Sequence, residues 1–169
     1  LPGSPFYGRS DWSRPVPWDK PFNGMLWTPS PDPQAAIHYD RGVGREQPGS
    51  IRLRVDNDSL AFWPGSGHTL HVDEGVTYRY SMWIKTEGDA RGWIEAIEML
   101  FRIGDRESHC STTVGPNQDW TRVEVAFTGK GEEAPFACPS IGAEGAGRVW
   151  FTDMAFEAMT GEGNTVKEG

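Results

Sequence analysis

The histidine and carboxylate side chains of this 169-residue chain do not form a known catalytic or metal-binding pattern. His68 and His71 stand three residues apart, as do Glu95 and Glu98. On a strand, that spacing places the two members of each pair on opposite faces. The sequence also lacks a nucleophile elbow, a phosphate-binding loop, an HExxH metal motif and a dinucleotide fingerprint. The pattern therefore favours a protein without catalytic activity.

Three carboxylates keep a hydrolytic alternative open. Cleavage of a glycosidic bond uses two carboxyl groups about 5–10 Å apart. Glu95, Glu124 and Glu144 could supply such a pair, but no spacing singles out two of them. A glycan-active enzyme therefore stays an alternative, while carboxylates on a β-sheet surface are usually only solvated.

Aromatic side chains offer a second kind of chemistry, the stacking of sugar rings. The chain has eight Trp. The C–H face of a sugar packs on an indole, while planar polar side chains bond its hydroxyls. Trp63 lies in a Phe-Trp-Pro-Gly-Ser-Gly segment typical of a loop, where its ring could be displayed or could simply pack. Trp93 opens a strand and fits either role, whereas Trp120 and Trp150 stand in alternating strands and are expected to be structural.

The segment 76–85 places a further Trp on a mixed polar face. Its β-branched and aromatic residues predict a strand, and alternation gives that strand one apolar face. The second face carries Arg79, Ser81, Trp83 and Lys85, the composition of a binding-groove floor. The alternative to a binding role is that Trp83 only covers the exposed surface of the sheet.

Composition narrows both the fold and the class of partner. The chain has 21 Gly and 13 Pro, and both are poor in helix interiors, which disfavours a helical bundle. No apolar run approaches the roughly 18 residues of a membrane span. The formal net charge of −8 argues against nucleic acid and anionic membranes as partners, because phosphate binding needs an excess of Lys and Arg.

Short alternating segments predict a two-sheet β-sandwich. The segment 93–103 could be helical by composition, but we expect a strand because its neighbours on both sides are strands. Residues 57–59 predict a turn, since Asn, Asp and Ser follow one another there. In all, seven to nine antiparallel strands are expected, at 50–55, 69–72, 76–85, 93–103, 105–113, 120–128, 134–141 and 148–157.

The two ends of the chain differ from this body. Nine of the 13 Pro fall within the first 48 residues, and Pro lacks the N–H that a central strand needs. Because this part also carries seven aromatic residues, we expect an irregular but ordered wrap over 1–48, packed on the sandwich of 49–158 as one domain. Residues 159–169 are polar and predict a tail or linker.

The two cysteines stand 28 positions apart and show no metal-binding spacing. Cys110 and Cys138 are either two small buried residues or a disulfide between neighbouring strands, as in a secreted protein. The first residues show no signal-peptide pattern. We therefore expect a mature form or a module of a larger protein.

Five motifs resemble those of a known group of modules. They are Gly-Ser-Ile-Arg-Leu-Arg-Val at 49–55, Phe-Trp-Pro-Gly at 62–65, Glu-Gly-Val-Thr-Tyr-Arg-Tyr-Ser-Met-Trp-Ile-Lys at 74–85, Asp-Trp-Thr-Arg-Val-Glu-Val-Ala-Phe at 119–127 and Gly-Arg-Val-Trp-Phe-Thr-Asp at 147–153. In order and spacing across residues 40–157, the chain resembles the carbohydrate-binding modules of families four, nine, sixteen and twenty-two.

The resemblance implies a jelly-roll sandwich that binds single glycan chains in a groove on its concave sheet. From their places in the motifs, the resemblance implies that Trp63 contacts sugar and that Arg79 faces the groove. Glu144 matches a late ligand-contacting Glu, although the Tyr that usually stands two residues earlier is Gly142 here. Such modules are usually joined to secreted polysaccharide hydrolases.

The resemblance also implies a possible site for a structural calcium ion. Many members hold Ca²⁺ with a carboxylate of a closing Asp-Asp pair. Here the first of the pair is Thr152, so Asp153 alone remains as a candidate ligand. No cofactor is required for binding.

We therefore expect an all-β jelly roll, an antiparallel two-sheet β-sandwich with an irregular Pro-rich N-terminal wrap. It would be extracellular and would bind neutral plant-type β-glycans (β-glucan, xylan or mannan) for an attached glycoside hydrolase. One alternative is an accessory domain whose wrap fills the groove and which docks a neighbouring catalytic domain; the other is the glycan-active enzyme. The expected contacts are stacking by Trp63, Trp83 and Trp93 and hydroxyl bonding by Arg79, Glu95 and Glu144.

Overall fold

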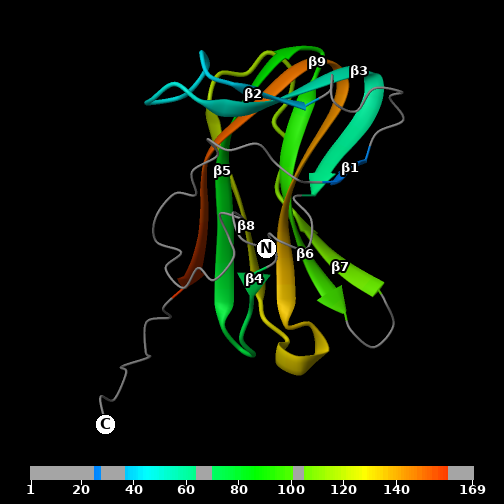
Figure 1. Cartoon of the computed structure of the whole chain (residues 1–169), viewed down its shortest axis with the longest axis vertical. Coiled ribbons are helices and arrows are strands. Elements are labelled where there is room, and N and C mark those ends of the chain that lie inside the picture. The colour runs from blue at the N-terminus through cyan, green and yellow to red at the C-terminus, as the bar shows by residue number, and fades with distance from the viewer. Residues whose placement is uncertain (1–24, 28–36, 64–69, 101–104, 160–169) are drawn as a thin grey trace.

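Antiparallel β-strands dominate the part of the protein that the structure describes (Figure 1). The structure is a computed structural model, and it describes residues 25–27, 37–63, 70–100 and 105–159. The prediction of an all-β fold is confirmed. The strands are β1 (Met25–Trp27), β2 (Ile37–Asp40), β3 (Ser50–Trp63), β4 (Leu70–His71), β5 (Thr77–Gly88), β6 (Arg91–Leu100), β7 (Asp105–Cys110), β8 (Thr121–Thr128) and β9 (Phe136–Met159), and a short 3-10 turn spans Gly131–Glu133.

Two long strands, β3 and β9, run through both layers of the sandwich and join them. In one layer, the second half of β9 pairs with β5 and with the first half of β3; β8 and β2 lie beyond them. In the other layer, the first half of β9 pairs with β6 and with the second half of β3; β7 and β1 lie beyond them. We call these the β5 layer and the β6 layer. β4 pairs with the start of β9.

The crossing between layers uses backbone conformations that most side chains would oppose. The register of β3 shifts at Asn57, which has a φ of 55°. Opposite this point, Gly145 and Gly147 of β9 have φ values of 94° and 145°. A Cβ atom at Gly147 would overlap the carbonyl oxygen of Glu87. Glycine therefore permits the bend and the close approach of the two strands.

The core lies between the layers and follows the alternation of the sequence. The predicted strands at 50–55, 76–85 and 120–128 each turn every second side chain inward, and 93–103 is a strand over its described part. Each fully buried apolar side chain contributes about 1.5–3 kcal/mol relative to exposure. The buried apolar residues of these four strands are Ile51, Leu53, Val55, Tyr78, Tyr80, Met82, Ile84, Ile94, Ala96, Val123, Val125 and Phe127.

Three predicted boundaries are wrong. Residues 57–59 are not a turn but continue β3, and Trp63 ends that strand instead of lying in a loop. The segments 134–141 and 148–157 are not separate strands but parts of β9. The Asn and Gly residues that indicate turns in these stretches serve as bends within continuous strands.

Parts of the predicted N-terminal wrap belong to the sheet. β1 and β2 both pair with β3, so these two stretches are regular strands. The remainder of the wrap, residues 1–24 and 28–36, lies outside the described residues, as does the predicted tail after Met159. Over the described ranges, no helix has the length and apolar character needed to cross a membrane.

Candidate functional site

The predicted binding residues divide between the two outer faces of the sandwich. Trp93 and Glu95 alternate with Ile94 and Ala96, which are buried in the core, so the former pair faces outward from the β6 layer. Arg79 and Trp83 alternate with the buried residues of β5 and face outward from the β5 layer. The sequence prediction treated all of them as one surface, and the structure places them on two.

The outward row of the β6 layer, which we call the β6 face, brings three predicted residues together. Its register pairs Trp93 with Gly142 and Glu95 with Ser140. Position 63 of β3 belongs to the same side, because Ala61, two residues earlier, also pairs with Gly142. The β6 face consists of Arg91, Trp93, Glu95 and Ile97 of β6 with Ser140, Gly142 and Glu144 of β9.

Trp93 takes the space that Gly142 leaves free. A Cβ atom at Gly142 would overlap the indole atoms Cε2, Cζ2 and Nε1 of Trp93. The half-buried ring therefore covers the β9 backbone at that point. Gly142 is thus the residue that leaves room for an aromatic ring from the neighbouring strand.

The carboxylates of the β6 face have no hydrogen-bond or ion-pair partner among the described residues. Glu95 is half-buried and Glu144 is exposed. Neither side chain forms a hydrogen bond or ion pair with another described residue. Trp93 and Glu95 are two residues apart on one strand, about 7 Å, so a ring on the indole can reach the carboxylate.

This geometry does not suit hydrolysis. Glu95 pairs with Ser140, and Glu144 lies four residues further along β9, a span of about 13 Å. Glu124 faces outward from the other layer, where Arg122 Nη1 lies 2.8 Å from its carboxylate. The backbone positions of the pair on the β6 face are thus further apart than the about 5–10 Å between the two carboxyl groups of glycosidases.

On the β5 layer, Trp83 and Arg79 are engaged within the protein. The guanidinium of Arg45 lies 4.1 Å from the Trp83 ring centroid, and its Nε donates to Asp153 Oδ2 at 2.8 Å. Arg79 Nη2 donates to Glu157 Oε2 at 2.8 Å. The hydrogen bond from Arg79 to Glu157 raises the pKa of Arg79, and the bond to Asp153 raises that of Arg45. Both cations are thus fixed in a charged network.

Trp150 is buried next to this network, as its structural assignment predicts. It is 4% exposed, and its indole N–H donates to Asp40 Oδ2 at 3.0 Å. Burial opposes ionisation of Asp40, but this bond, the backbone N–H groups of Gly42 and Val43 and the charge of Arg52 outweigh it and lower the pKa of the carboxyl. The sequence analysis missed Asp40 and Arg45, because both stand in the Pro-rich part where no periodicity marks a partner.

Asp153, the candidate calcium ligand, is engaged by a cation within the described structure. Its carboxylate faces the guanidinium of Arg45, which supplies the positive charge there. Asp153 also lies outside the one group of three potential metal ligands that the described ranges contain. Calcium binding by Asp153 stays a prediction.

No disulfide joins Cys110 and Cys138 in the described structure. Cys110 of β7 and Cys138 of β9 stand on strands that flank β6 on either side, so they are not on neighbouring strands and the alternative of a disulfide is not realised. Partial burial, and secondly the charge of Glu95, raise the pKa of the Cys110 thiol. It is therefore protonated at neutral pH.

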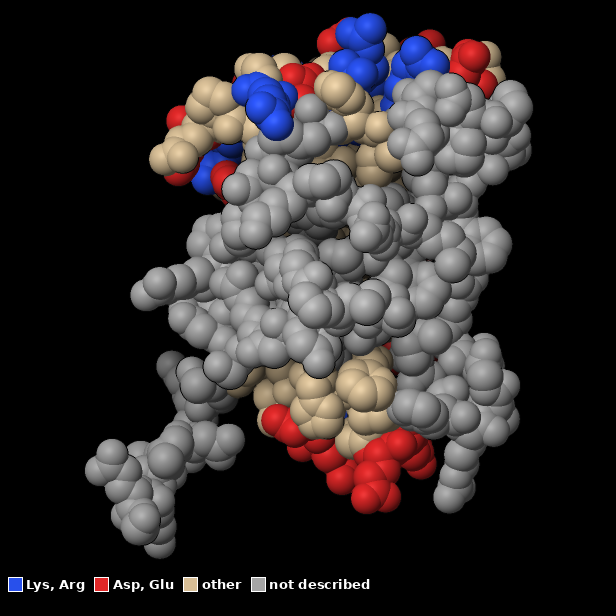
Figure 2. Space-filling model, viewed as in Figure 1, with Lys and Arg blue, Asp and Glu red and all other residues tan. Residues whose placement is uncertain are grey.

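Charge is distributed unevenly along the molecule. Figure 2 shows Lys and Arg side chains gathered at one end, where Asp and Glu side chains lie among them, and mainly acidic side chains at the other end. At the bend where the layers meet, a shallow hollow combines Arg54 and Arg148 with Asp56 and Glu87. Mixed signs in one hollow do not provide the continuous positive surface that nucleic acid requires.

Comparisons with solved structures find similar folds. One is the family 22 module and catalytic GH10 module of Clostridium thermocellum endo-1,4-β-D-xylanase 10B with xylohexaose: TM-score 0.57, 14% identity, 80% of this chain and 26% of that chain. Another is TmCBM61 with β-1,4-galactotriose: TM-score 0.55, 11% identity, 81% and 89% of the two chains. A third is the second family 22 xylan-binding domain of Paenibacillus barcinonensis Xyn10C: TM-score 0.53, 13% identity, 79% and 91%. The chain has the jelly-roll fold of these carbohydrate-binding modules.

The similarity lies in the fold and not in the sequence. No protein-family profile matches the chain, and no curated protein matches it. The chain corresponds to about a quarter of the xylanase polypeptide, but to most of each of the other two modules. The module fold predicted from five short motifs is therefore confirmed.

Proposed function

We propose that this chain is a non-catalytic carbohydrate-binding module that holds a neutral β-linked glycan on the β6 face. Trp93 stacks on a sugar ring, and Glu95 and Glu144 accept hydrogen bonds from hydroxyl groups. Trp63, whose position shares this side of the sheet, provides a second stacking contact. The observation that carries the proposal is the half-buried Trp93 indole, seated on Gly142 beside a carboxylate without a described partner.

The chemistry of the β6 face indicates an uncharged ligand. Its ionisable groups are the carboxylates of Glu95 and Glu144 and the guanidinium of Arg91, the cross-strand partner of Glu144, so acidic groups are in excess there, and the whole chain has a formal net charge of −8. An acidic polysaccharide would be repelled, whereas sugar hydroxyls are good donors to carboxylates. Two proteins of similar fold were solved in complex with xylohexaose and with β-1,4-galactotriose, which are both neutral β-linked chains. These support β-glucan, xylan or mannan as the ligands to test.

The same proposal places the protein outside the cell, where it directs an attached glycoside hydrolase to its polymer. Plant cell-wall polysaccharides are too large to enter cells, so a module that binds them acts outside the cell. The presence of a similar module beside a catalytic GH10 module in the xylanase chain supports the linkage.

The test measures binding to a panel of soluble xylan, β-glucan, mannan and galactan by affinity electrophoresis and calorimetry. For the ligand that binds, Trp93→Ala should lower the affinity by about 10–100-fold, equivalent to about 1.4–2.8 kcal/mol, because a buried aromatic contact is lost. The melting temperature should fall only modestly, since the ring packs on the β9 backbone at Gly142 but lies outside the core.

The Trp83→Ala variant identifies the face. Trp83 is also half-buried, but it lies on the opposite layer beneath Arg45. Affinity should stay within about twofold of the wild type in this variant. Loss of binding with Trp83→Ala and retention with Trp93→Ala would move the site to the β5 layer, and no binding to any glycan would overturn the proposal in favour of a docking domain.

A further inference from the structure

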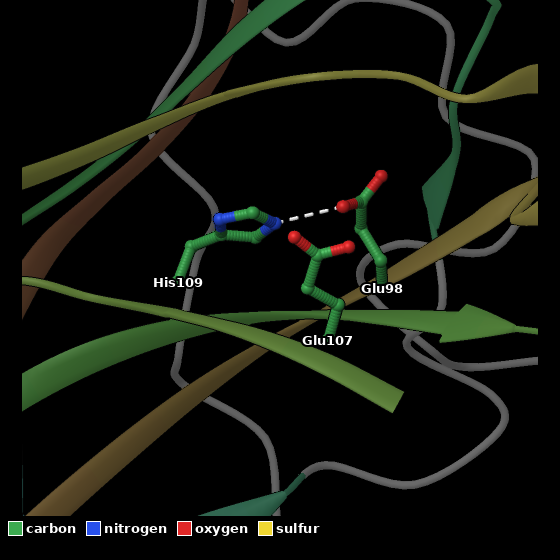
Figure 3. Close-up of side chains that lie close together, drawn as sticks. All are labelled: Glu98, Glu107 and His109. Atoms are coloured by element: carbon green, nitrogen blue, oxygen red, sulfur yellow. Dashed lines mark hydrogen bonds and ion pairs between the residues drawn. The ribbon is translucent and has the colours of Figure 1, made fainter. Parts of the chain in front are cut away.

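A cluster of three potential metal ligands lies inside the sandwich, on the opposite side of β6 from Trp93. Glu98 points inward from β6, and its cross-strand partner on β7 is Glu107; His109 stands two residues further along β7. Figure 3 shows the three side chains pointing toward one another. One ligand atom from each residue lies within 4.8 Å of the others.

The buried carboxylate of Glu98 is incompletely satisfied. Glu98 is 0% exposed, and one of its oxygens, Oε2, lies 2.7 Å from His109 Nε2. The other oxygen, Oε1, is buried and has no hydrogen-bond partner in the part of the chain that the structure describes. A carboxylate held away from water without partners is costly, so this atom requires an explanation.

The other two ligands are held but accessible. The His109 ring stacks on Phe127, with ring centroids 5.3 Å apart and planes at 13°. This contact fixes the direction of its nitrogens. The side chains of His109 and Glu107 are 24% and 43% exposed, so an ion can reach the cluster from solvent.

Lys130 provides the positive charge at this place in the structure. Its Nζ contacts Glu107 Oε2 and lies 3.9 Å from Glu98 Oε2. The Lys130 side chain is 36% exposed, so its flexible stem can turn outward to water. It therefore behaves as a cation that a more highly charged ion could replace.

We infer that Glu98, Glu107 and His109 bind a divalent first-row transition-metal ion, with Zn²⁺ as the representative. Two carboxylates and one imidazole form a nitrogen-and-oxygen set that suits Zn²⁺, and water can complete the tetrahedral geometry. Their two negative charges neutralise the ion. The imidazole favours zinc over Ca²⁺ and Mg²⁺, which prefer oxygen ligands. The site would pin the β6–β7 hairpin to the core and does not depend on glycan binding.

The test uses the full chain stripped of metal with a chelator and titrated with Zn²⁺ by calorimetry, with thermal unfolding in parallel. The expected result is one equivalent of Zn²⁺ bound, a raised melting temperature, and at least tenfold weaker binding of Ca²⁺. His109→Phe keeps the stack on Phe127 and removes the nitrogen; it should weaken Zn²⁺ binding at least tenfold. Glu107→Gln should do the same, whereas Glu132→Gln, an exposed carboxylate outside the cluster, should leave it unchanged.

Lys130→Met separates a metal site from an ion-pair cluster. Removal of the competing ammonium should tighten Zn²⁺ binding severalfold. If the cluster is only a network of ion pairs, this variant is destabilised and gains no affinity for Zn²⁺. Equal Zn²⁺ affinity in the wild type and His109→Phe, or binding confined to the exposed Cys110 thiol and lost in Cys110→Ser, would overturn the inference.

Discussion

At the scale of single residues, Gly142 has the most direct consequence for the proposed site. The absence of a side chain at this position lets the Trp93 indole cover the β9 backbone, and Glu95 lies on the same row of β6. The sequence identified Trp93 and Glu95 as candidates by type. It could not predict that they share a face with Glu144 and not with Trp83, because that depends on which layer each strand joins.

Gly142→Ala should reduce glycan affinity by about tenfold while the protein stays folded. The added methyl group overlaps the indole, and a half-exposed ring moves more easily than the β9 backbone. Calorimetry with the best-binding glycan measures the affinity, and Trp fluorescence reports the movement of the indole. Gly115→Ala is the matched control, since a Cβ there meets nothing within 4 Å; equal affinity in both variants would contradict the role of the Trp93 position.

Asp40 should make stability depend on pH in the acid range. Its folded pKa lies below the ordinary value of 3.8, so its stabilising effect is fully present above about pH 4 and is lost as the pH falls through the folded pKa. Asp40→Asn should lower the free energy of unfolding at pH 7 by about 1–2 kcal/mol, through weaker bonds to Trp150 and the backbone.

Urea unfolding of wild type and Asp40→Asn between pH 7 and pH 3 provides the measurement. The difference between the two proteins should narrow as the pH falls below about 4. A difference that stays constant over this range would show that the charge of Asp40 does not contribute.

At the scale of elements, the two strands that cross between layers explain where sequence interpretation succeeded and where it did not. The alternation in 50–55, 76–85 and 120–128 is local, so it predicts the buried residues directly. The bends in β3 and β9 carry Asn and Gly, which are equally typical of turns. Only the pairing of each half-strand with a different neighbour shows that the chain continues, and a single sequence does not reveal that pairing.

Gly147→Ala should destabilise the fold by about 2–4 kcal/mol. Its φ of 145° lies outside the range that L side chains favour, and the new Cβ overlaps the Glu87 carbonyl. Urea unfolding with Gly115→Ala as reference measures the loss. A loss below about 0.5 kcal/mol would mean that the bend tolerates a side chain, and that β3 and β9 are not fixed there by glycine.

At the scale of the whole molecule, the two outer faces differ in how their side chains are engaged. The β5 layer encloses Trp83, Trp150 and Arg79 in hydrogen bonds and cation–π contacts, which stabilise the fold. On the β6 face the Trp93 ring packs only on Gly142 among the described contacts, and Glu95 and Glu144 form no hydrogen bond or ion pair with a described residue. Of the six residues predicted to bind sugar, the account keeps four on one face. The jelly-roll fold and the acidic net charge, both predicted from the sequence, agree with a module for neutral glycans.

The most direct test of this account is an NMR titration of ¹⁵N-labelled protein with neutral β-linked hexasaccharides of xylose, glucose and mannose. We expect saturable shifts in the indole N–H signal of Trp93 and in the amides of Glu95, Ser140 and Glu144. The Trp83 indole and the Arg79 amide should stay unchanged. Shifts confined to Trp83 and Arg79, or no saturable shift with any of the three ligands, would contradict the assignment of the β6 face as the binding surface.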